Sequence, residues 1–70
     1  MARLRARITI DERGRIIGLG GFASIVGAHE VKKWGNKEVD LTIEDKEGKV
    51  VKKTKVKVRD SYDLIQRGKV

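Results

Sequence analysis

Residues 3–10 alternate without interruption between polar and apolar side chains, and no other feature constrains the fold of this chain as much. The apolar set is Leu4, Ala6, Ile8 and Ile10, and the polar set is Arg3, Arg5, Arg7 and Thr9. A period of two is typical of a half-buried β-strand, and the outer face of this strand is a row of arginines. Residues 11–14 (Asp-Glu-Arg-Gly) supply a turn whose glycine tolerates a positive φ, and residues 15–17 begin a partner strand. The sequence therefore predicts a first β-hairpin.

A second hairpin is predicted over residues 39–59. Val39, Leu41 and Ile43 alternate with Asp40, Thr42 and Glu44, residues 45–48 form the turn, and the return strand runs from Val50 to Arg59. Lys52 interrupts the apolar face of the return strand, so we expect a bulge or an edge position there. Strand pairing is expected to set Asp40 and Glu44 opposite lysines, and such pairs contribute roughly a few tenths of a kcal/mol each.

The segments outside the hairpins predict short helices. Phe22 and Val26 lie at helical spacing before Gly27, although their β-branched neighbours leave a strand or a loop open as alternatives. Residues 29–36 either extend this helix or form a loop. Residues 60–67 predict a helical tail with an N-cap at Asp60 or Ser61 and a stop at Gly68. We therefore divide the chain into a main domain, residues 1–59, and a short C-terminal helical tail, residues 60–70.

The charge of the chain is large and arranged in blocks. Seventeen Lys and Arg against ten Asp and Glu give +7 over 70 residues. Residues 1–17 carry +3, residues 38–47 carry −4, and residues 49–59 carry +6. An excess of this size attracts polyanions, and nucleic acid is the commonest of them. High charge of both signs is also typical of proteins from hot environments, where surface ion pairs cost less.

Length and composition bound the remaining possibilities. A chain of 70 residues has room for a single small core, and it has no cysteine to cross-link that core. We therefore expect stabilisation by a homodimer. No segment approaches the roughly 20 apolar residues of a membrane span, and no signal peptide is recognisable, so we expect a cytoplasmic protein without membrane contact.

Catalytic and cofactor chemistry find little support in the sequence. His29 is the single histidine, and no second metal ligand stands at zinc-site spacing, so we expect no enzyme, no metal and no cofactor. Residues 18–23 (Gly-Leu-Gly-Gly-Phe-Ala) match a dinucleotide fingerprint, but that motif works only within a parallel βαβ unit. Tight turns and close backbone approach at a dimer interface explain these glycines better. Trp34 lies among lysines, and we interpret it as a core residue rather than a platform for stacking bases.

Residues 7–17 (Arg-Ile-Thr-Ile-Asp-Glu-Arg-Gly-Arg-Ile-Ile) resemble the first hairpin of the AbrB/SpoVT/MazE-type swapped-hairpin DNA-binding domains. The order of elements, a hairpin, a short helix and a second hairpin over residues 3–58, agrees with that family. The resemblance implies an intertwined homodimeric swapped-hairpin barrel in which arginines of the first hairpin approach DNA, with Arg15 as the position that carries over directly. The chain departs from the family pattern at Gly18-Leu19, at Ala23 and Ser24, and in a longer segment over residues 28–37.

These observations predict a mostly β fold, with one or two short helices and two β-hairpins flanking a short helix. The predicted function is nucleic-acid binding by a homodimeric AbrB-like transcriptional regulator, with double-stranded DNA as the main partner and RNA as the second. The candidate nucleic-acid-binding residues are Arg3, Arg5, Arg7, Arg13, Arg15, Lys53, Lys55 and Lys57. One alternative is a small monomeric SH3-like or OB-like barrel that binds chromatin or RNA without specificity. A second is a protein-interaction module.

Overall fold

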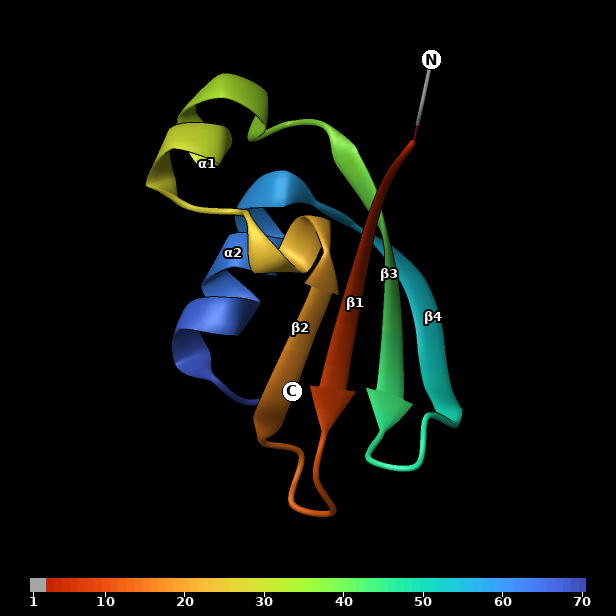
Figure 1. The fold of residues 1–70 in the computed structure, drawn as a ribbon. Helices are drawn as coiled ribbons and strands as arrows, with labels where there is room; N and C mark the ends of the chain where they lie inside the picture. Colours follow the sequence, from red (N-terminus) through yellow and green to blue (C-terminus); the bar gives the residue numbers. More distant parts are fainter. Residues whose placement is uncertain (1–2) are drawn as a thin grey trace.

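The computed structural model describes residues 3–70, which form a mixed four-stranded β-sheet accompanied by helices (Figure 1). The strands are β1 (Leu4–Ile10), β2 (Ile16–Gly21), β3 (Glu38–Asp45) and β4 (Val50–Lys57), and the helices are the 3-10 helix η1 (Phe22–Ser24), α1 (Ala28–Trp34) and α2 (Val58–Arg67). The strand order is β2-β1-β3-β4. The predicted mostly β fold with two hairpins is confirmed.

The two hairpins join each other within one chain. β1 is antiparallel to β2, β3 is antiparallel to β4, and the inner strands β1 and β3 run parallel, with Ala6 beside Leu41. Parallel neighbours need a long connection, which is supplied by β2, η1 and α1. The swapped-hairpin barrel of two chains stays a prediction, whereas the four-stranded sheet is built from a single chain.

The core lies between one face of the sheet and the helices. Its buried members are Ala6, Ile8, Phe22, Ala23, Val39, Leu41, Ile43 and Val58. Ile8, Val39 and Val58 are completely buried, which stabilises the fold by about 1.5–3 kcal/mol per side chain. Figure 1 shows the helices gathered on this side of the sheet. The opposite face carries no helix in the part of the chain that the structure describes.

Both hairpins turn through the same arrangement. Asp11 Oδ1 accepts hydrogen bonds from the backbone N–H groups of Arg13 and Arg15, and Asp45 Oδ1 accepts them from Glu47 and Lys49. Gly14 and Gly48 have φ values of 79° and 82°, which only glycine adopts without strain. The turns are confirmed as predicted. The equivalence of the two turns is not evident from the sequence, because residues 11–15 and 45–49 share only an aspartate and a glycine at the same positions.

The segment after the first hairpin differs from the predicted helix. Helical structure stops at Ser24 as a single 3-10 turn, because Ile25 and Val26 are β-branched and Gly27 is extended with φ −148°. A separate helix, α1, then starts at Ala28, where the Glu30 carboxylate accepts the Gly27 N–H at 2.9 Å. Trp34 at the end of α1 packs on the core with its ring centroid 6.2 Å from that of Phe22, so its interpretation as a core residue is confirmed.

The C-terminal tail begins earlier than predicted. β4 ends at Lys57 and α2 starts at Val58, so the expected N-cap at Asp60 or Ser61 is wrong. The Val58 N–H is satisfied by the Lys37 carbonyl at 2.9 Å, and the buried Ser61 hydroxyl donates to the Val58 carbonyl at 2.7 Å. Gly68 ends the helix in the left-handed conformation, as predicted. The expected irregularity near Lys52 is confirmed, because β4 is an edge strand with a register shift opposite Ile43 and Glu44.

Candidate nucleic-acid interface

The face of the sheet opposite the core, which we call the open face, is built from charged rows. β1 contributes Arg5 and Arg7 with Arg3 just before it, β3 contributes Glu38, Asp40, Thr42 and Glu44, and β4 contributes Lys53, Lys55 and Lys57. The six cations against three carboxylates leave a net charge of +3. The structure therefore brings six of the eight predicted binding residues onto one surface.

Two of the three carboxylates of the open face, Asp40 and Glu44, form ion pairs, and both pair with arginines. Arg3 Nη1 lies 3.4 Å from Asp40 Oδ2, and Arg7 Nε lies 3.7 Å from Glu44 Oε1. Sequence analysis expected lysine partners. That expectation holds only for the register of Asp40, which stands opposite Lys55, whereas Glu44 stands opposite Val50 because of the register shift. β3 lies between β1 and β4, so its acids are within reach of both rows.

Four cations of the open face therefore take part in none of the ion pairs found among residues 3–70. They are Arg5, Lys53, Lys55 and Lys57. All four are exposed. An exposed cation without a protein partner is fully available to an external anion, since no existing contact has to be broken.

A groove of about 560 Å³ runs between the arginine and lysine rows. It is lined by Arg3, Arg5, Asp40, Leu41, Thr42, Lys53, Thr54 and Lys55. Four of these residues are cationic and one is anionic, so the charge that lines the groove is positive.

Two glycines extend the open face beyond the arginine row. Gly18 and Gly20 of β2 stand opposite Thr9 and Arg7, on the same face. A Cβ added at Gly20 would lie 3.1 Å from Arg7 Nε, so the absence of a side chain gives the Arg7 guanidinium room above β2. Neither glycine is among the nucleic-acid-binding residues predicted from the sequence. Glycine at alternate positions of a strand was the signal, since it marks close approach of a ligand or another backbone.

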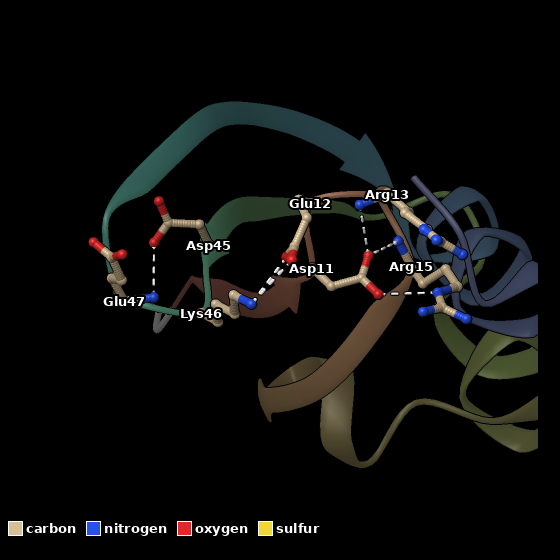
Figure 2. A network of polar contacts seen from close by, with 7 residues as sticks. All are labelled: Asp11, Glu12, Arg13, Arg15, Asp45, Lys46 and Glu47. Atoms are coloured by element: carbon tan, nitrogen blue, oxygen red, sulfur yellow. Dashed lines mark hydrogen bonds and ion pairs between the residues drawn. The ribbon is translucent and has the colours of Figure 1, made fainter.

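The other two predicted residues, Arg13 and Arg15, lie in the turn of the first hairpin, outside the groove. Figure 2 shows the Arg15 guanidinium donating to Asp11, with Nε 2.9 Å from Oδ2. Each turn is electrically neutral, because residues 11–15 and residues 45–49 both contain two acids and two bases. Arg13 and Arg15 therefore stand among carboxylates rather than beside the free cations.

Hydrogen bonds at the hairpin turns lower the pKa values of two carboxyl groups. The backbone N–H of Arg15 holds the pKa of Asp11 below its usual value, and the Arg13 N–H and the Arg15 guanidinium act in the same direction. A hydrogen bond from the Lys46 ammonium group lowers the pKa of Glu12. Lys46 Nζ lies 3.0 Å from Glu12 Oε2, so this pair links the two turns (Figure 2).

The open face contains no aromatic residue among its described members. Phe22 and Trp34 belong to the core side, and Tyr62 lies in α2. Within residues 3–70, no group of three His, Cys, Asp or Glu residues is placed to hold a metal ion. Neither α-helix of the described chain has the length and apolar character needed to cross a membrane.

Comparison of the chain with family models, with curated proteins and with solved structures gave no significant match.

Proposed function

We propose that the protein binds the phosphate backbone of double-stranded nucleic acid, most directly DNA, across its open face. The observation that carries the proposal is the set of four cations without ion-pair partners on the open face, of which Arg5, Lys53 and Lys55 line the groove. Phosphate contacts by Lys and Arg supply most of the affinity of sequence-independent nucleic-acid binding.

The composition of the open face favours a duplex over an unpaired strand. Proteins that hold single strands stack the bases on aromatic side chains, in addition to binding phosphates. The aromatic residues of this chain lie on the core side and in α2, so stacking has no platform on the open face. A duplex keeps its bases stacked and presents a regular phosphate backbone, which matches rows of Lys and Arg.

The test is the salt dependence of binding to a random DNA duplex, measured by fluorescence anisotropy. Four phosphate contacts give a slope of log K against log salt of about −3.6, a loss of roughly a hundredfold between about 50 and about 200 mM salt. The double variant Arg5→Gln/Lys55→Gln removes two of the free cations. We expect its slope to fall to about −1.8.

A matched control removes the same charges from the helical side of the molecule. Lys32 in α1 and Arg67 in α2 are exposed, so Lys32→Gln/Arg67→Gln gives the same total charge as the first variant. The control should keep the slope of the unmodified protein. Equal slopes for the two variants, or no duplex binding by the unmodified protein at about 50 mM salt, would refute the proposal.

Arg15 separates this proposal from the one that the AbrB-type resemblance implies. In a swapped-hairpin regulator Arg15 approaches DNA, so Arg15→Ala should weaken binding strongly. If the open face binds instead, the same variant should change affinity by less than about threefold, because Arg15 is engaged by Asp11 outside the groove. The transcriptional regulator stays a prediction that this variant decides.

A further inference from the structure

The two edges of the sheet differ in chemistry. β4, at one edge, carries lysines at positions 52, 53, 55 and 57. β2, at the other edge, has the sequence Ile-Ile-Gly-Leu-Gly-Gly, with no charged residue and no proline. Charged side chains, lysine above all, are the usual protection of an edge strand against pairing with another strand. β4 is protected in this way and β2 is not.

The outer side of β2 is covered only where the strand begins. The Ile16 N–H donates to the Gly68 carbonyl at 2.9 Å, and the Val70 N–H donates to the Gly14 carbonyl at 2.8 Å. Beyond Ile16, no strand or tail within residues 3–70 pairs with the outer side of residues 17–20. An edge strand leaves the N–H and C=O groups of alternate residues unpaired, so this segment offers hydrogen bonds to a further strand.

The same part of the chain exposes apolar side chains. Ile17 is 54% exposed, Leu19 43% and Ile25 64%, and they are three of the six exposed large hydrophobic residues in the described chain. Ile17 is also the extra residue at the register shift between β1 and β2. Apolar side chains next to unpaired backbone groups are what a docking strand covers.

We propose that β2 pairs antiparallel with β2 of a second copy of this chain, across a two-fold axis perpendicular to the sheet. An edge without charge tolerates its own copy, because no like charges face each other, whereas an acidic partner would be attracted to the lysine edge instead. Pairing at β2 also places the two lysine-rich strands at the outer ends of an eight-stranded sheet. The inference does not depend on the proposed function, and it differs from a dimer that exchanges hairpins.

The antiparallel arrangement has a consequence for the open face. A two-fold axis perpendicular to the sheet keeps both open faces on the same side, so the two arginine rows and the two glycine pairs form one continuous surface. Gly18 and Gly20 of both copies then lie at its centre. The dimer thus doubles the basic surface without burying any of its cations.

The experiment is sedimentation equilibrium of the unmodified protein and two single variants. Ile17→Lys places a charge on β2 at an exposed position, so it does not disturb the core. We expect it to raise the dimer dissociation constant by about tenfold or more, because each copy then carries a lysine on the uncharged strand that has to pair. Val51→Lys is the matched control, since Val51 is 59% exposed and lies on the opposite edge strand. It should leave the dissociation constant unchanged.

Hydrogen exchange provides a second readout that needs no variant. Amide protons in residues 17–20 should exchange more slowly as the concentration of the unmodified protein rises, while those of β4 should not change. A protein that stays monomeric at every accessible concentration would overturn the inference. So would a dimer that Ile17→Lys leaves intact, and that result is the one expected of exchanged hairpins.

Discussion

The carboxylate of Asp11 organises the first turn through three hydrogen bonds of 2.9 Å each, two from backbone N–H groups and one from the Arg15 guanidinium. The bond from the Arg15 N–H is the largest cause of the lowered pKa of Asp11, whose usual value is 3.8. The folded state therefore binds the proton of this group less tightly than the unfolded state does. The contribution of Asp11 to stability is present above about pH 4, and it is lost as the pH falls through the lower folded pKa.

We therefore expect the free energy of unfolding of Asp11→Asn to fall less steeply at acid pH than that of the unmodified protein. The free energy of unfolding should be lower for Asp11→Asn than for the unmodified protein at about pH 7, and the two values should converge toward about pH 2. Urea unfolding followed by circular dichroism at a series of pH values measures this difference. A gap between the two proteins that stays constant over the whole range would show that ionisation of Asp11 does not contribute.

The two hairpin turns show which structural features are determined by the local sequence. Gly14 and Gly48 were predictable because a positive φ is a property of a single position, and both adopt it. Residues 11–15, part of the run that carries the family resemblance, have a counterpart in the second turn, Asp45 to Lys49, with the same two backbone N–H bonds to the aspartate. The turn geometry therefore does not require the arginine at position 15. The partners chosen by Asp40 and Glu44 were not predictable, because they depend on which strand lies next to β3.

The helical elements η1 and α2 contain the same serine contact in different surroundings. The Ser24 hydroxyl donates to the Gly21 carbonyl, and the Ser61 hydroxyl donates to the Val58 carbonyl, both at 2.7 Å. Ser24 is exposed, so water replaces its hydrogen bond when the hydroxyl is removed. Ser61 is completely buried, so no water replaces the hydrogen bond to the Val58 carbonyl when the hydroxyl is removed.

Ser61→Ala should therefore lower the free energy of unfolding by about 1 kcal/mol, while Ser24→Ala should lower it by less than about 0.5 kcal/mol. Chemical denaturation of the two variants under the same conditions provides the comparison. If the two substitutions lower the free energy of unfolding equally, burial does not determine how much the Ser61 hydrogen bond contributes to stability.

The boundaries of elements were predictable only where a local signal ends them. Gly68 stops α2 as expected, since a left-handed residue is a local requirement. The end of β4 was placed two residues too late, because Val58 continues the apolar alternation of the strand and is buried in either conformation. The change to a helix at Val58 depends on its contact with Lys37, which lies far away in sequence. Periodicity carries no information about such a contact.

At the scale of the whole molecule, both hairpins follow from alternation, but their arrangement does not. The parallel pairing of β1 with β3 is a contact between segments about 35 residues apart in sequence, and it decides that the arginine row and the lysine row share one face. Sequence analysis identified both rows as candidates without a reason to unite them. The groove between the two rows exists only through this arrangement.

The single-chain sheet predicts how the molecule unfolds. Because β1 pairs with β3 in the same chain and the buried core is contributed by one copy, the folded state does not require a second chain. The variant Ile17→Lys, in which pairing at the β2 edge is blocked, should therefore remain folded as a monomer. It should unfold in a single transition whose midpoint is independent of protein concentration. Thermal unfolding followed by circular dichroism over a roughly hundredfold range of concentration measures this midpoint.

An intertwined dimer behaves differently, because its chains must separate in order to unfold. A midpoint that rises with the concentration of Ile17→Lys would therefore establish exchanged hairpins in place of the single-chain sheet.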